Sequence, residues 1–209
     1  MEKDKPAQIR NKHITRKRLV AAVGSLLAKK GFKGIGVNAV AREAGVDKVL
    51  IYRYFGGLPG LISTYGKEGD FWPSALELAG GDLQRFANYS LSKKLSVLGH
   101  TFIKALLKRP VTCEIMIWEM SDRNELTAEL ESIRENSMTE FFQMFLQGKA
   151  DEHDLLAVVA LMGAAISYLV LRSKNIDLYS GLDLSSDQGW QRLEKAITTI
   201  IRGIIKENM

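Results

Sequence analysis

The chain has 209 residues, of which 46% are hydrophobic and 25% are charged, so it can bury a substantial core and is not a disordered protein. Its 4 prolines, with no alternating β-branched runs bounded by turns, favour an all-helical fold over a sheet. The single cysteine, Cys113, rules out an internal disulfide and suits a reducing cytoplasm. The N-terminus is too polar for a secretory signal, so we expect a cytoplasmic protein.

Charge is distributed unevenly along the chain. Residues 1–55 carry 13 Lys and Arg against 4 Asp and Glu, a balance of +9, whereas the remainder carries 16 against 20, a balance of −4. A basic end on a mildly acidic body is what phosphate binding by that end requires. The alternative is a solvated basic face without a specific partner.

The first predicted element is a helix over residues 16–30. Residues 1 to about 13 read as a flexible basic arm, and Thr15 is expected to cap the helix. Leucine and valine recur at helical spacing, and two lysines followed by Gly31 mark its end. We expect its apolar stripe to close a small three-helix core with the elements that follow.

Residues 37–55 read as two short helices meeting at a tight turn. The first helix has apolar residues at helical spacing and stops at Gly45, where a left-handed backbone costs little. Val46 fills the corner, and Asp47 can cap the second helix, which is expected to start at Lys48. This pattern is a helix-turn-helix.

The block GFKGIGVNAVAREAGVDKVLIYRYF, residues 31–55, resembles the DNA-binding signature of the TetR family of bacterial transcriptional regulators. The resemblance covers about residues 15–65. It rests on the pairs Gly31-Phe32 and Val40-Ala41, the corner Ala44-Gly45-Val46, Lys48, and the run from Ile51 to Phe55. It implies a DNA-binding head over 15–69, after a basic arm at 1–14, and a helical effector-binding and dimerisation domain over 70–209.

Five positions depart from the family pattern. Gly36 stands where the family often has threonine, Asp47 replaces a commoner serine, and Leu58 lies where lysine is common. The pair Val49-Leu50 replaces a small residue and threonine. Each change alters a capping, phosphate or base contact that the resemblance implies.

In a helix-turn-helix the second helix enters the major groove, so six residues are candidates for DNA contact. Lys48 suits phosphate or guanine, and exposed apolar side chains suit thymine methyls. The alternative for Leu50 is burial within the head. The six candidates are Asn38, Lys48, Val49, Leu50, Tyr52 and Tyr54.

After a further helix opening at Leu58, residues 70–88 are predicted to form an irregular connection between head and body. The body then shows helical patterns that begin near Ser90 or Ser92, Pro110, Asn124, Asp151 and Ser186. The pattern of residues 110–121 is nearly all apolar and is the best candidate wall for an effector pocket. Core packing is the alternative for each pocket candidate. The candidates are Phe102, Cys113, Met116, Trp118, Met120, Phe141 and Phe145.

The pattern over residues 151–174 is apolar almost all round, so this helix needs burial on more than one side. Its length is at the short end for a membrane span, and we expect no membrane. With the last helix it can form a four-helix bundle across a two-fold axis; the resemblance also implies a dimer built from the last two helices. A monomer core is the alternative. The predicted interface consists of Ala160, Gly163, Ala164, Ser167, Ile197 and Ile201.

These observations favour a homodimeric transcriptional regulator, a repressor that leaves a near-palindromic DNA operator when a small-molecule effector binds. Neither the histidines nor Cys113 show metal-ligand spacing, and no nucleophile elbow or P-loop is present. We therefore expect no enzyme, cofactor or metal. The departures from the family pattern leave one alternative open, a protein-interaction module with the same fold.

Overall fold

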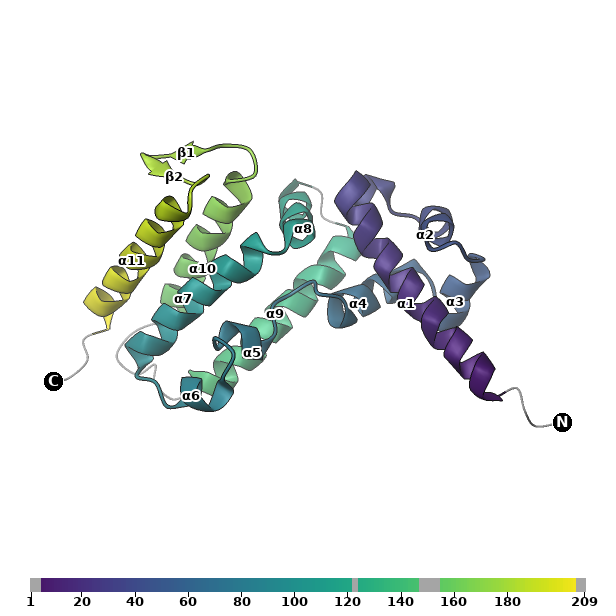
Figure 1. Ribbon diagram of the computed structural model, residues 1–209, viewed down its shortest axis with the longest axis horizontal. Coiled ribbons are helices and arrows are strands. Elements are labelled where there is room, and N and C mark those ends of the chain that lie inside the picture. The colour runs from purple at the N-terminus through teal and green to yellow at the C-terminus, as the bar shows by residue number, and fades with distance from the viewer. Residues whose placement is uncertain (1–4, 122–123, 147–154, 206–209) are drawn as a thin grey trace. The chain divides into compact units, whose positions relative to one another are not determined.

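The structure, a computed structural model, describes residues 5–121, 124–146 and 155–205 (Figure 1). It confirms the all-α class. The first helices are α1 (Lys5–Lys30), η1 (Phe32–Gly34), α2 (Val37–Ala44), α3 (Val49–Phe55), α4 (Leu58–Glu68), α5 (Ala75–Leu78) and α6 (Leu83–Ala87). The later ones are α7 (Leu91–Leu107), α8 (Pro110–Ser121), α9 (Glu125–Phe145), α10 (Leu155–Arg172) and α11 (Asp187–Ile204).

The chain divides into two compact units. Unit 1 is Met1–Trp72 with Pro110–Glu135, and unit 2 is Pro73–Arg109 with Asn136–Met209. Residues 110–135 therefore pack with the helix-turn-helix segment rather than with the rest of the predicted body. Because compact units report packing and not function, the functional division at residue 70 stays a prediction.

Helix α1 begins at Lys5, so the start predicted at Thr15 is wrong, and the predicted arm is helical from Lys5 onward. Pro6 falls in the first turn, where its missing amide is harmless, and good helix formers follow it. The predicted end at Lys30 is confirmed, because Gly31 takes a left-handed φ of 61°.

The core of unit 1 lies between α1 and the helices α2, α3 and α4 (Figure 1). Helix α1 buries one stripe against it, as its apolar spacing predicts. Ile115 of α8 and Leu130 of α9 are completely buried in the same core. The stripe of α1 consists of Leu19, Ala22, Val23, Leu26 and Leu27.

The predicted irregular connection over 70–88 contains two short helices instead. Ser74 caps α5 by accepting a hydrogen bond from the Glu77 amide at 3.2 Å. Asp82 caps α6 by accepting from the Arg85 amide at 2.9 Å. Each side chain satisfies a first-turn amide that would otherwise lack a partner, and this allows very short helices to form.

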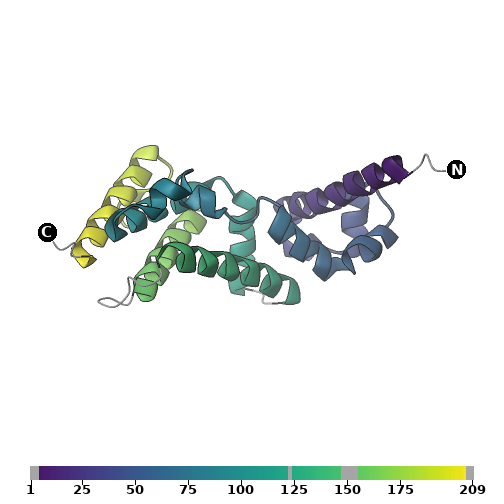
Figure 2. The same ribbon diagram turned by 90° about the horizontal axis from the view of Figure 1, so that it is seen from below.

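Unit 2 is built on α7, against which both α10 and α11 pack (Figure 1, Figure 2). Ser90 caps α7, and Ser186 caps α11 through the Gly189 amide at 3.1 Å. A small antiparallel hairpin, β1 (Leu178–Tyr179) with β2 (Leu182–Asp183), joins α10 to α11. Its loop residues Ser180 and Gly181 both have positive φ, which is typical of a type I′ turn.

Helix α10 has a mean hydropathy of 2.1 over 18 residues and is long and apolar enough, by these criteria alone, to cross a membrane. One such helix is weak support for a span, because core helices have the same composition. Its buried residues are Leu155, Ile166, Val170 and Leu171.

Candidate functional site

The corner between α2 and α3 has the predicted geometry. Gly45 is left-handed, with φ 63° and ψ 43°. Its amide donates to the Arg42 carbonyl at 3.1 Å, and the Val46 amide donates to the Ala41 carbonyl at 3.0 Å. These two bonds form a Schellman motif, which satisfies the last carbonyls of α2 and turns the chain sharply.

Asp47 caps the second helix as predicted. Its Oδ1 accepts a hydrogen bond from the Val49 amide at 2.8 Å. Lys48 already has helical dihedrals, so the predicted start of the helix lies within one residue of the observed one. The carboxylate of Asp47 is thus engaged at the N-terminus of α3, where the helix dipole also favours an anion.

Helix α3 has one buried side and one exposed side. Ile51 is completely buried, whereas the side chains of Val49 and Tyr52 are 60% and 57% exposed. Lys48 and Arg53 are exposed as well, and no acidic partner is found for either among the described residues. The exposed side of α3 therefore combines two cations with apolar and aromatic surface.

The other candidates for DNA contact lie differently. Asn38 is exposed on α2. Leu50 is only partly exposed and packs against the core of unit 1, so the expectation that it faces outwards is wrong and the alternative of burial describes it better. Tyr54 is also packed on the core, with Lys12 and Arg53 over its ring at 5.6 Å and 5.9 Å. It presents a cation-flanked hydroxyl rather than an isolated one.

Arg53 and Lys12 are exposed cations outside the six candidates for DNA contact. Both approach the Tyr54 ring, and their positions on two different helices explain why local spacing did not connect them. Other basic groups of the head are engaged internally. Arg16 donates to Glu68, with one bond of 2.6 Å, and lowers the pKa of that carboxyl. Lys29 pairs with Glu43 at 2.8 Å.

The predicted effector-pocket residues divide between the two units. Cys113, Met116, Trp118 and Met120 belong to α8 in unit 1, where Trp118 packs on the core and Cys113 is buried. Phe102, Phe141 and Phe145 are buried in unit 2. Phe141 and Phe145 share an aromatic cluster with Phe86, with ring centroids 5.0 Å to 5.5 Å apart.

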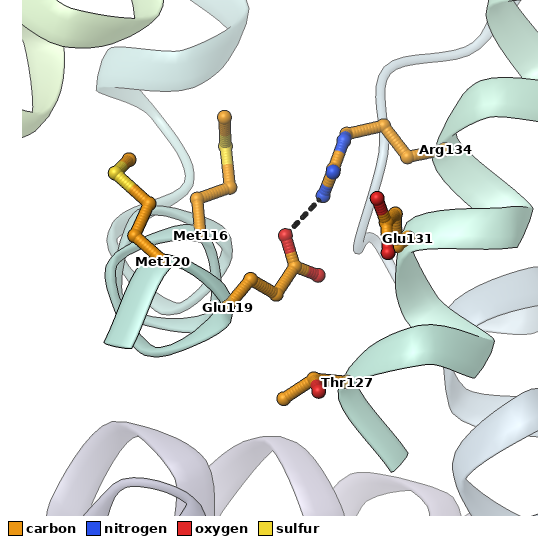
Figure 3. A pocket seen from close by; sticks show the side chains of 6 residues that line it. All are labelled: Met116, Glu119, Met120, Thr127, Glu131 and Arg134. Atoms are coloured by element: carbon orange, nitrogen blue, oxygen red, sulfur yellow. Dashed lines mark hydrogen bonds and ion pairs between the residues drawn. The ribbon is translucent and has the colours of Figure 1, made fainter. Parts of the chain in front are cut away.

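A cavity of about 220 Å³ lies between α8 and α9 inside unit 1 (Figure 3). Figure 3 shows Glu119 reaching from α8 towards Arg134 of α9, with Met116 and Met120 on the same helix as Glu119. Arg134 donates from Nη1 to Glu119 Oε2 at 2.6 Å. Glu119 interrupts the nearly all-apolar sequence of α8, and its side chain is largely buried. Thr127 and Glu131 complete the lining.

Glu119 is held in an environment that opposes its charge. Its side chain is 11% exposed, and Oε1 is buried without a hydrogen-bond partner among the described residues. Burial raises the pKa of this carboxyl, and Glu131 and Glu135 add to the rise, while Arg134 acts in the other direction.

Only some residues of the predicted dimer surface are exposed to solvent. Ala160 and Ala164 are exposed on α10, and Gly163 and Ser167 are partly exposed. Ile197 and Ile201 are buried within the chain, so they offer little surface to a partner. A neighbouring apolar groove of about 300 Å³ is lined by both helices, with Leu161 and Ile200 at 73% and 55% exposure. Its lining residues are Val158, Leu161, Met162, Ala165, Ile166, Leu169, Leu193, Ala196, Ile197, Ile200 and Ile204.

The geometry of α2 and α3 is that of a helix-turn-helix, and a family model matches this part of the chain. Residues 19–61 match the family model described as "Bacterial regulatory proteins, tetR family". No curated protein of related sequence matches the chain.

Solved structures match nearly the whole chain. The fatty acid degradation regulator FadR from Bacillus halodurans is 16% identical with a TM-score of 0.65, over 93% of this chain and 97% of that one. FadR from Bacillus subtilis, in complex with stearoyl-CoA, is 17% identical with a TM-score of 0.62, over 90% and 98%. NalD from Pseudomonas aeruginosa, the secondary repressor of the MexAB-OprM multidrug efflux pump, is 16% identical with a TM-score of 0.61, over 91% and 96%.

The resemblance seen in the sequence is thereby confirmed. Residues 19–61 carry the TetR-family signature, and the chain has the all-α fold of TetR-family transcriptional regulators. At identities of 15–19%, this structural likeness shows the fold alone.

Proposed function

We propose that this protein is a sequence-specific DNA-binding repressor that acts as a homodimer and leaves its operator when a small-molecule effector binds. The observation that carries the proposal is the exposed side of α3, where Lys48, Val49, Tyr52 and Arg53 surround a helix held by a buried Ile51. Cations bind phosphates, and the apolar Val49 side chain suits a thymine methyl.

The departures from the family pattern are compatible with DNA binding. The Asp47 carboxylate accepts the Val49 amide, so it serves as a helix cap at this position. Gly36 leaves the N-terminus of α2 without a side-chain cap, and its amides are available to a phosphate. Leu58 is packed against the core, so the phosphate contact of a lysine is absent there.

Dimerisation is supported by the apolar surface that α10 and α11 expose. A monomer rarely leaves a large contiguous apolar patch in water, and a self-complementary patch on two helices suits a two-fold four-helix bundle. We expect Leu161 and Ile200, with the exposed alanines of α10, to form the centre of this interface.

Release by a small molecule is supported by a cavity in unit 1 and by the kinds of regulators that share the fold. One of these was solved with stearoyl-CoA, and another represses a multidrug efflux pump.

A gel-shift series with fragments from the region upstream of the chain's own gene tests operator binding. The proposal predicts that one fragment binds at least about 10³-fold more tightly than bulk DNA at physiological salt. If no fragment is preferred over bulk DNA, operator binding is wrong, and a protein partner for the same surface becomes the better reading.

A further inference from the structure

The cavity between α8 and α9 combines a largely buried carboxyl group, Glu119, with the flexible apolar side chains of two methionines. Two carboxylates, Glu119 and Glu131, and one guanidinium, Arg134, line it. The guanidinium is also shared, because its Nε lies 3.9 Å from Glu135 and its plane lies over the Trp72 ring at 5.7 Å. The lining thus holds two carboxyl groups and one guanidinium.

Glu119 Oε1 is the atom that points to a ligand. It is buried without a hydrogen-bond partner among the described residues, whereas Oε2 is satisfied by Arg134. A buried acceptor without a partner costs about 1–3 kcal/mol, and more for a charged group, so such groups in native proteins need an explanation. A donor on a bound ligand would satisfy it.

The remaining lining determines the shape of such a ligand. Met116 and Met120 are flexible, polarisable side chains that adapt to apolar bodies and aromatic rings. A cavity of about 220 Å³ is smaller than the usual range for drug-sized ligands, so the ligand is small. The site thus offers one anionic acceptor at a buried point and an adaptable apolar wall.

We propose that this cavity binds a small organic cation that donates a hydrogen bond, such as a primary ammonium on an apolar body, with Glu119 Oε1 as the acceptor. The ammonium would supply the missing donor, and its positive charge would strengthen the hydrogen bond to the carboxylate. The role of this ligand as the effector rests on the proposed function, whereas its binding does not.

Both walls of the cavity pack on the DNA-binding part of unit 1. On α8, Trp118 lies against Gly31 at the end of α1, where an added Cβ would come 2.6 Å from its ring nitrogen. On α9, Leu130 and Ile133 lie against Gly66 of α4, the helix that follows α3. Occupancy that moves α8 relative to α9 would therefore act on α1 and α4 by direct contact.

The test is calorimetric titration of the full-length protein with three matched probes. 2-Phenylethylammonium carries charge and donors, 2-phenylethanol carries a donor without charge, and benzyltrimethylammonium carries charge without a donor. We expect the first to bind wild type at least about tenfold more tightly than either of the others, since each lacks one part of the interaction.

Two variants assign the effect to the residue. Glu119→Gln should weaken the affinity for 2-phenylethylammonium by about tenfold or more, and it should leave the affinity for 2-phenylethanol within about twofold of wild type. Glu114→Gln, on the same helix and outside the cavity lining, is the matched control and should behave as wild type. The comparison of the three probes on wild type needs no variant, so it stands even if Glu119→Gln fails to fold.

Equal affinities for 2-phenylethylammonium and 2-phenylethanol would overturn the proposal, as would the absence of binding by any probe up to about 10 mM. Unchanged ammonium binding in folded Glu119→Gln would also contradict it. Operator affinity measured without any probe is a separate result. If the protein binds the ammonium but prefers no DNA fragment, the cavity proposal stands and the proposed function is wrong. If it prefers one DNA fragment but does not bind the ammonium, the proposed function stands and the cavity proposal is wrong.

Discussion

Gly66 of α4 lies directly against Ile133 of α9, so closely that a Cβ added at Gly66 would come 2.6 Å from Ile133 Cδ1. It would also come 2.8 Å from Leu130 Cδ2. The helix that follows the recognition helix is therefore seated on the helix that lines the cavity, with no room for a side chain between them.

Replacing Gly66 with valine should destabilise the protein by about 1–3 kcal/mol, because a well-packed core must shift to admit the added atoms. Urea denaturation followed by circular dichroism measures the change in the free energy of unfolding. Gly203→Val is the matched control, since Gly203 also lies near the end of a helix and meets nothing within 4 Å. Equal losses in the two variants would show that the Gly66 contact is not tight.

Lys48→Ala should reduce the slope of log affinity against log salt by about one, because one phosphate contact and its released counterion are lost. Fluorescence anisotropy with a labelled operator fragment at several salt concentrations gives the slope. Lys108→Ala, an exposed lysine of unit 2, should leave the slope unchanged. A fall of the same size in both variants would assign the effect to net charge rather than to the recognition helix.

Val49 should affect sequence preference instead of salt dependence. Its side chain is 60% exposed at the start of α3, where base edges are contacted in helix-turn-helix proteins. Val49→Ser should relax or shift the preferred base at one position in each half-site, by about 1–3 kcal/mol of discrimination, in a selection from random DNA. The same preferred sequence for wild type and variant would place Val49 outside the base contacts.

Substituting glutamate for Leu161 should convert the dimer into monomers, since a buried charge without a partner opposes association. Sedimentation velocity at several concentrations measures the change. Leu178→Glu, on the equally exposed hairpin, should leave the dimer intact. A large side chain at Gly163 should also disrupt the dimer, and an unaffected dimer in both α10 variants would move the interface elsewhere.

The pH dependence of stability should report the buried carboxyl of Glu119. Because folding raises its pKa, the folded protein binds more protons than the unfolded chain at pH values above the ordinary 4.5. The contribution of Glu119 to stability is therefore fully present below pH 4.5 and is lost as the pH rises through the higher pKa of the folded state. Arg134, Glu131 and Glu135 surround the carboxyl and are present in both proteins compared.

The free energy of unfolding of wild type, minus that of Glu119→Gln, should consequently decline as the pH rises above 4.5. Denaturation curves of the two proteins at matched pH values supply this difference. A difference that grows with pH would mean that Glu119 is ionised and stabilised by Arg134, and that the cavity is not short of positive charge.

The features that the sequence predicted correctly are the local ones. Gly45 as a left-handed stop and Asp47 as a cap depend on a few adjacent residues, so their roles follow from backbone chemistry. The helix start at Lys5 is also a local feature. The high charge of this segment predicts a flexible arm instead, and that prediction is wrong from Lys5 onward. The hairpin between β1 and β2 turns at Ser180 and Gly181, and a two-residue turn of this kind is also a local feature of the sequence.

The site was harder to predict because it depends on packing between distant segments. Periodicity did not show that Leu50 lies on the buried edge of α3, nor that Ile197 and Ile201 face their own chain. The predicted pocket residues fall in two units, and the burial of Glu119 on α8 depends on a second helix, α9. A local sequence pattern in α8 does not predict that α9 packs against it.

Hydroxyl-radical footprinting of the protein on its preferred DNA fragment tests the central claim most directly. A dimer joined through α10 and α11, with its two α3 helices in successive major grooves, predicts two equal protected patches on a near-palindrome. Their centres should be about 34–36 Å apart, or a multiple of this. A single protected patch bound at full affinity by a stable monomer would contradict the account.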